Sequence, residues 1–280
     1  MPEKLPYLNL GCGYHFNDAW TNIDFVSTGS DVIAHNLLHG IPAPDSHYEV
    51  VYHSHVLEHF SKQNAVIFLK ECFRVLKPGG TLRVAVPDLR MIINEYLAIS
   101  LLLDKSPEDE YLQSCHQWLL LEMYDQTVRS KPGGEMAAFI KQERLLNPDF
   151  IIKRCGYEVK SILEAKVNPS IDFHTERKAK ILNLASLKQK LKTLLLKRLL
   201  KKDYDLLPEA KFRSSGEIHQ WMYDKHSLRR ILLETGFTNI ETQTAFKSSI
   251  PDWESFQLES NNNEIRKPDS LFMEAQKPAK

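Results

Sequence analysis

The sequence has few cysteines, no surplus of charge and no long apolar run, and each absence excludes a class of protein. Its four cysteines lie far apart without a C-x-x-C pair, which excludes a local zinc knuckle or a redox dithiol. The 36 basic and 36 acidic side chains balance, which argues against a general nucleic-acid binder. No run of about 18 apolar residues occurs, so we expect no membrane-spanning helix. The first residues contain no apolar signal core, and we expect a cytoplasmic protein.

The first 90 residues alternate short apolar segments with polar turns. A helix is expected to begin after Ser61, a good N-cap residue, and to end at the turn formed by residues 77–80. Strand, turn, strand, helix, strand is the order typical of a parallel α/β sheet. The expected strands are residues 7–10, 21–26, 31–34, 49–52 and 81–86.

The character of the chain changes after residue 90. Residues 91–210 are mostly helical in pattern, with a looser segment at 147–168. A helix at 226–233, closed by Gly236, and strands at 238–245 and 270–275 then resume the α/β pattern. We therefore predict an α/β domain from residues 1–90 and 211–280, interrupted after the fifth strand by a helical insertion, residues 91–210, that caps the sheet.

The first strand runs into a glycine turn, L-N-L-G-C-G, at residues 8–13. Glycine lets the backbone approach a ligand at the carboxyl edge of a sheet, where open α/β folds bind their ligands. Asp24 ends the second strand, where a carboxylate holds the ribose of a nucleotide. Asp31 is a competing ribose ligand because its distance from the turn is nearer the usual 20 residues or so. We prefer Asp24, since it ends a strand whereas Asp31 begins one.

Four motifs together resemble the class I S-adenosylmethionine-dependent methyltransferases, and in particular a bacterial branch of them. They are L-N-L-G-C-G at 8–13, W-x-N-x-D at 20–24, V-L-E-H at 56–59 and R-V-L-K-P-G-G at 74–80. The resemblance covers residues 7–90 and returns at 219–224. It implies a Rossmann-like, mostly parallel sheet of seven strands with an antiparallel C-terminal strand, and S-adenosylmethionine as cofactor. It also implies a small-molecule or saccharide hydroxyl as methyl acceptor, in cell-surface polysaccharide biosynthesis.

The resemblance further implies which residues contact the cofactor. Four groups of residues are expected at the carboxyl ends of strands 1 to 4: the methionine part at Gly11, Cys12 and Gly13, the ribose at Asp24, the adenine at Asn36 and Leu37, and the methyl-transfer face at Ser54 and His55. Two departures stand out. His15 stands at the position where the family usually has a third glycine. Only ten residues separate Gly13 from Asp24, which is too few for a full helix in the connection between the first two strands.

Methyl transfer to an oxygen of high pKa needs a general base, and a histidine or carboxylate suits that role. The candidates are His55, His59, Asp88 and His219, and the sequence leaves the choice among them open. Asp88 has the alternative role of capping the helix after strand 5. His219 has the alternative role of packing the insertion against the sheet.

Two other functions compete with methyl transfer. The altered glycine motif and the missing first helix are compatible with a catalytically silent cofactor-binding module. Residues 55–59 also match H-x-x-E-H, and His53, His55 and His59 together suggest a metallohydrolase. That motif requires a helix that holds both histidines on one face, whereas here it directly follows a strand. We therefore predict no metal site.

The segment 177–202 carries ten basic residues and no acidic one. Leucines recur in it at helical spacing, so it has the composition of a helix that lies on an anionic membrane. A solvated helix of the cap is the alternative. Peripheral membrane contact through residues 177–202 is thus one expected property of the insertion.

Overall fold

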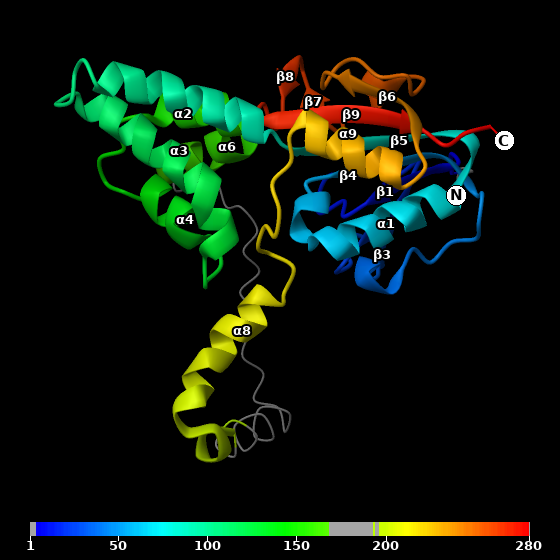
Figure 1. Cartoon of the computed structure of the whole chain (residues 1–280), viewed down its shortest axis with the longest axis horizontal. Helices are drawn as coiled ribbons and strands as arrows, with labels where there is room; N and C mark the ends of the chain where they lie inside the picture. The colour runs from blue at the N-terminus through cyan, green and yellow to red at the C-terminus, as the bar shows by residue number, and fades with distance from the viewer. Residues whose placement is uncertain (1–3, 168–192, 194–195, 280) are drawn as a thin grey trace.

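A seven-stranded sheet forms the centre of the computed structural model, which describes residues 4–167, 193 and 196–279 (Figure 1). The strand order is β3-β2-β1-β4-β5-β9-β6, and β9 runs antiparallel to both of its neighbours while the other pairs are parallel. The predicted mostly parallel sheet with an antiparallel C-terminal strand is confirmed. The strands are β1 (Tyr7–Leu10), β2 (Thr21–Asp24), β3 (Val32–Ala34), β4 (Tyr48–Ser54), β5 (Leu76–Pro87), β6 (Thr238–Gln243) and β9 (Ser270–Gln276).

The two faces of the sheet are covered differently. Successive side chains of a strand point to opposite faces, so Leu8 and Val51 pack on one side while Tyr7 and Val50 pack on the other. The first face is covered by α1 (Lys62–Val75) and α9 (Lys225–Glu234), which lie in front of the sheet in Figure 1. The second face packs against Trp20 and the segment around η4 (Trp253–Phe256), where aromatic rings fill the core.

Local sequence signals correctly predicted where α1 begins and where α9 ends. The Ser61 side chain accepts a hydrogen bond from the backbone N–H of Asn64, as expected of an N-cap. Gly236 follows α9 with φ +98°, a conformation that favours glycine. α1 ends at Val75 and β5 begins at once at Leu76, but residues 77–80 interrupt the pairing with β4: Leu76 pairs with Tyr48 and Thr81 with Val50, and Gly79 has φ +80°. No helix lies between β1 and β2 in the described chain, as the ten-residue spacing predicted.

Helices follow β5 and lie to one side of the sheet in Figure 1. The looser segment predicted at 147–168 is wrong for its described part. There Pro148 occupies the first turn of α5, where its missing N–H costs nothing, and α6 follows after Gly156. The domain boundaries at 91 and 210 remain predictions. The helices are α2 (Leu89–Leu103), α3 (Glu110–Val128), α4 (Gly134–Ile140), α5 (Pro148–Cys155), α6 (Tyr157–Val167) and α8 (Leu207–Arg213).

Short elements complete the described chain, and the hairpin among them was not predicted. The short elements are η1 (Leu37–His39), η2 (Leu57–His59), η3 (Lys201–Leu206) and the hairpin of β7 (Ser260–Asn261) and β8 (Glu264–Ile265).

No described helix is both long and apolar enough to span a bilayer. Of the basic segment, residues 177–192 and 194–195 lie outside the described residues, so membrane contact through it stays a prediction.

A buried arginine ties the segment over the second face to the sheet. Arg83 of β5 is fully buried and forms ion pairs with Glu259 and with Glu274 of β9, the latter at 2.6 Å. Its guanidinium also donates to the carbonyl of Thr244 at 2.7 Å and lies 4.3 Å from the centre of the Trp253 ring. One cation therefore neutralises two buried carboxylates from separate parts of the chain.

We predict that Arg83→Met destabilises the protein by about 3–5 kcal/mol, because it leaves Glu259 and Glu274 buried without a counter-charge. Urea unfolding followed by circular dichroism measures this. Arg230→Met, on the exposed side of α9, is the matched control and should change stability by less than about 0.5 kcal/mol. Equal unfolding midpoints for the two variants would contradict the role assigned to Arg83.

Candidate functional site

The strand order reverses between β1 and β4, and this creates an open crevice at the carboxyl ends of the two strands. Leu10 pairs with His53 in the register of these strands, so the loops that begin at Gly11 and Ser54 leave the sheet side by side. Chains that leave neighbouring strands toward opposite faces do not fill the space between them. The crevice is therefore where a ligand is expected in this fold.

Three cavities open at this edge. The glycine-turn cavity, about 420 Å³, is lined by residues 11–15 of the loop after β1, by the end of β4 and by residues 266–272. The β2–β3 cavity, about 680 Å³, is lined by the loops after β2 and β3, by η2 and by residues 213–220. The insertion cavity, about 150 Å³, lies between the end of β5 and α3. His55 lines all three, so the cavities meet at its side chain.

His55 turns sharply above the sheet. Its φ of +54° is in the left-handed region that few non-glycine residues adopt, and its backbone N–H donates to the carbonyl of Ala85 in β5. The ring Nε2 lies 2.8 Å from Oγ of Ser270, at the start of β9, and Nδ1 lies 3.2 Å from Oε1 of Glu58. A ring held at both nitrogens is fixed in orientation, and this one faces the junction of the cavities.

The glycine turn has two positions that require glycine. Gly11 has φ +64°, and a Cβ there would lie 2.3 Å from Cγ2 of Val56. Gly13 has φ +54°, and its N–H donates to Oδ2 of Asp24 at 2.8 Å. Asp24 thus holds the turn while also lining the β2–β3 cavity. Between the glycines, burial raises the pKa of the Cys12 thiol to about 12, so it stays protonated.

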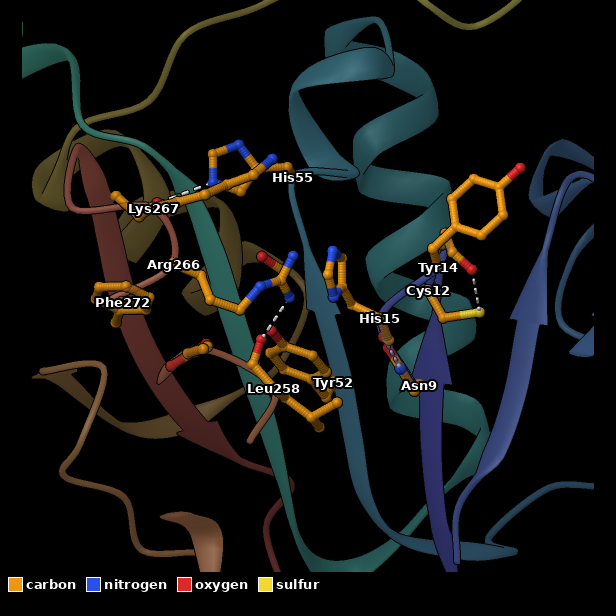
Figure 2. A pocket seen from close by; sticks show the side chains of 15 residues that line it. Asn9, Cys12, Tyr14, His15, Tyr52, His55, Leu258, Arg266, Lys267 and Phe272 are labelled. Carbon is orange, nitrogen blue, oxygen red and sulfur yellow. Dashed lines mark hydrogen bonds between the residues drawn. The ribbon is translucent and has the colours of Figure 1, made fainter. Parts of the chain in front are cut away.

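Figure 2 shows the glycine-turn cavity from close by. Its walls face one another across the carboxyl end of β4: Cys12, Tyr14 and His15 stand on the β1 side, and Arg266 and Lys267 on the side of β9. The Arg266 guanidinium donates to the carbonyl of Leu258 at 2.9 Å, which holds it in the wall. Ser54 also lines this cavity. Its two basic side chains suit a small anionic group.

The β2–β3 cavity has features that suit a planar heteroaromatic ring. Phe25, next to Asp24, presents a side chain that is 62% exposed, and Leu37 lies across the same cavity. Asn36 accepts the N–H of Leu38 through Oδ1, which leaves its side-chain amide N–H groups for other contacts. An apolar ring, an amide and a carboxylate therefore line one pocket. Phe25 was not among the residues that the sequence singled out.

Two predicted base candidates lie on either side of Glu58. The Glu58 side chain is buried, with His55 at 3.2 Å and Nε2 of His219 at 4.0 Å from Oε1. Burial would raise the pKa of Glu58, but the imidazoles of His55, His219 and His59 outweigh burial and lower it to about 2. Burial lowers the pKa of His219 to about 3, and it also lowers that of His59. The His219 ring is therefore neutral near pH 7, and His55, whose Nδ1 faces Oε1, is the residue that most lowers the pKa of Glu58.

Other candidates lie away from the junction. Asp88 is the N-cap of α2, where Oδ1 accepts the N–H groups of Arg90 and Met91, and it does not line the three cavities. Asp31 pairs with Lys4 at 3.6 Å and does not line them either. His53 is fully buried in contact with Phe68, so the three-histidine arrangement of the metallohydrolase hypothesis does not form.

Sequence reasoning missed the partners that reach the site from distant parts of the chain. Ser270 lies 215 residues after His55, and no local pattern links the two. Glu122 of α3 lines the insertion cavity and is held by Arg154 of α5 through hydrogen bonds of 2.5–3.0 Å. Burial raises the pKa of Glu122, and Arg154 opposes that effect. The one signal present in the sequence was an acidic residue, Glu122, within a segment predicted to be mostly helical.

Comparison with known proteins agrees with the motifs of the N-terminal part of the chain. Residues 16–84 match the family model described as "Methyltransferase domain". A probable S-adenosylmethionine-dependent methyltransferase from Mycolicibacterium smegmatis is 43% identical over 56 residues, which are 20% of this chain and 21% of that protein. The chain thus aligns with about a fifth of the length of this curated relative. The recognition of a class I methyltransferase from the motifs is confirmed.

Solved structures of low similarity were also found. S-adenosylmethionine-dependent methyltransferases from Thermotoga maritima, described as a possible histamine N-methyltransferase, and from Archaeoglobus fulgidus are each 11% identical, with a TM-score of 0.38. They align with 99% of this chain and with 84% and 87% of their own. Likeness of this degree says nothing about the substrate.

We predict that His53→Leu makes the protein less sensitive to acid. Burial lowers the pKa of folded His53 to about 4 from an ordinary 6.5, so between these values the unfolded chain binds a proton that the folded chain does not. The stability that neutral His53 contributes is complete above pH 6.5 and is lost as the pH falls toward 4, by up to about 1.4 kcal/mol per pH unit. Urea unfolding at several pH values measures the slope. Parallel stability curves for wild type and variant would contradict the prediction.

Proposed function

We propose that this chain, which carries a class I S-adenosylmethionine-dependent methyltransferase domain, transfers the methyl group of that cofactor to a hydroxyl group of a small molecule or saccharide. One observation carries the proposal: a cavity suited to a nucleoside and a cavity suited to an amino acid meet at His55, where a third cavity opens toward the insertion. This arrangement matches a ligand with two ends and a reactive centre between them.

The residues at the crevice fit the cofactor part by part. The adenosine is assigned to the β2–β3 cavity, with Asp24 accepting hydrogen bonds from the ribose and Phe25 and Leu37 flanking the adenine. The methionine part is assigned to the glycine-turn cavity, where Arg266 and Lys267 attract its carboxylate. Gly11, which has no room for a Cβ, lines both cavities and allows the ligand to pass close to the backbone.

Methyl transfer requires alignment and a base. When bound, the cofactor supplies a methyl group on a sulfonium, so the S–CH₃ bond breaks with its electrons left on sulfur while the acceptor oxygen forms the new O–CH₃ bond. The chain holds the acceptor in line and takes its proton. We assign the proton to the imidazole of His55, because this ring lines the insertion cavity as well as the two cavities assigned to the cofactor.

The insertion cavity is the proposed acceptor site. Its lining combines Glu122, Gln126 and Asp269 with the apolar Ile92 and Met222. Several polar groups next to apolar patches suit a polyhydroxylated molecule such as a sugar, whose ring has polar edges and an apolar face. A role in polysaccharide biosynthesis follows from the sequence resemblance and belongs to this proposal.

Asp24→Ala should weaken binding of S-adenosylmethionine at least about tenfold, since a hydrogen bond to a charged group contributes roughly 1.5–3 kcal/mol. Isothermal titration calorimetry measures the affinity. Asp31→Ala is the matched control and should bind like wild type, because Asp31 lies outside the cavities and pairs with Lys4. Thermal unfolding confirms that the variants are folded. Weaker binding by Asp31→Ala alone would reverse the assignment of the ribose.

His55→Gln should lower the rate of methyl transfer by about 100-fold or more, because general-base catalysis contributes that much. Its affinity for S-adenosylmethionine should stay near that of wild type. The assay measures S-adenosylhomocysteine formed with a panel of nucleotide sugars and free monosaccharides, and His226→Gln on the exposed side of α9 is the control. Full activity in His55→Gln would remove His55 as the base, and cofactor binding without turnover on any acceptor would favour a silent module.

A further inference from the structure

Glu58 is an unusual buried carboxylate. Its side chain is 1% exposed, and neither carboxylate oxygen has a hydrogen-bond partner in the described part of the chain. Nδ1 of His55 and Nε2 of His219 lie 3.2 and 4.0 Å from its Oε1. A buried carboxylate oxygen without a hydrogen bond costs free energy unless a cation compensates it. Oε1 therefore has the His55 ring beside it, while Oε2 has no hydrogen-bond partner among the described residues.

Two imidazoles converge on this carboxylate. Glu58, His59 and His219 each bring one ligand atom within 4.8 Å of the others. The rings of His59 and His219 meet edge to face, with their centres 4.7 Å apart. Nδ1 of His59 lies 3.2 Å from the carbonyl of Ile218, to which it donates its proton, so Nε2 carries the lone pair. A ring whose other nitrogen donates to a backbone carbonyl is the usual state of a histidine that binds a metal.

The backbone holds these residues together although they come from distant parts of the chain. The carbonyl of Glu58 accepts the N–H of Gln220 at 2.7 Å and that of Trp221 at 3.2 Å. The side-chain amide of Gln220 donates to the carbonyl of His59 at 2.8 Å, and the N–H of His219 donates to the carbonyl of Gln126 in α3. Hydrogen bonds therefore fix the backbone positions that carry Glu58, His59 and His219 relative to one another.

We propose that Glu58, His59 and His219 bind a divalent transition-metal cation of the zinc type. One carboxylate and two imidazoles form a donor set that suits Zn²⁺ and chemically similar ions, and three protein ligands leave a coordination position open. His59 lines the β2–β3 cavity and His219 lines the insertion cavity, so the cation lies at the wall between them. This differs from the arrangement of His53, His55 and His59 considered from the sequence.

The role of the cation rests on the proposed function. A cation at the wall of the insertion cavity would bind the acceptor oxygen in its open position and lower the pKa of that hydroxyl. The hydroxyl proton then passes to the imidazole of His55, and the oxygen takes the methyl group. Nδ1 of His55, beside Oε1 of Glu58, would orient the carboxylate toward the cation.

Metal binding is tested on the full chain, freed of metal by dialysis against a chelator. Zn²⁺ is titrated by calorimetry, and Co²⁺ is titrated by visible absorption, whose intensity reports nitrogen and carboxylate ligands in a site of low coordination number. We expect one cation per chain. Glu58→Gln and His219→Ala should each weaken binding at least about 100-fold, beyond the 10- to 100-fold cost of losing an outer partner. His226→Ala, an exposed histidine on α9, should bind like wild type.

Two further measurements decide whether the metal site exists even if a variant does not fold. If a variant is unstable, the wild-type protein still answers the question, because a specific site raises the melting temperature with added Zn²⁺ and a chelator reverses the rise. Calorimetry with S-adenosylmethionine on the same samples separates this proposal from the proposed function. Failure of wild type to bind one Zn²⁺, or equal binding by His219→Ala and His226→Ala, would overturn the metal site whether or not the cofactor binds.

Discussion

The reversal of strand order between β1 and β4 is the constraint on which the site depends. Two loops that begin at the same level of the sheet diverge and leave a crevice that the sheet itself does not fill. The left-handed turn at His55 then places one imidazole above this crevice instead of continuing along β4. Three cavities open to that ring, so the geometry of a single residue determines where their contents meet.

The return of the chain after the insertion completes the site. Residues 218–221 are bonded by their main chain to η2 on one side and to α3 on the other. Ile218 and Gln220 line the β2–β3 cavity, and His219 between them lies beside Glu58. The helices that follow β5 are thereby connected to the cavity edge at a point far from their own start at Leu89. A change in the packing of these helices would therefore change the positions of Glu58 and His59.

The local features of the site were predictable, and those that depend on long-range packing were not. The glycine turn, Asp24 and Ser54 lie at strand ends, and the short apolar segments before them identify those ends. The sequence left the role of Asp88 open, because a carboxylate just after a strand can act either as a general base at the edge of the sheet or as the N-cap of the next helix. Ser270 and the pairing of Glu58 with His219 depend on contacts across more than 150 residues, which periodicity does not report.

The place of β9 in the sheet has a consequence for the order in which the chain is made. The ribosome delivers the parallel strands β1 to β5 first, and β6 emerges later with no neighbour to pair with, since its partner in the sheet is β9. β9 then enters between β5 and β6 and satisfies the exposed backbone edges of both. The β5 edge of the nascent sheet therefore stays open until β9 is made, and β9 then covers that edge and brings β6 into the sheet.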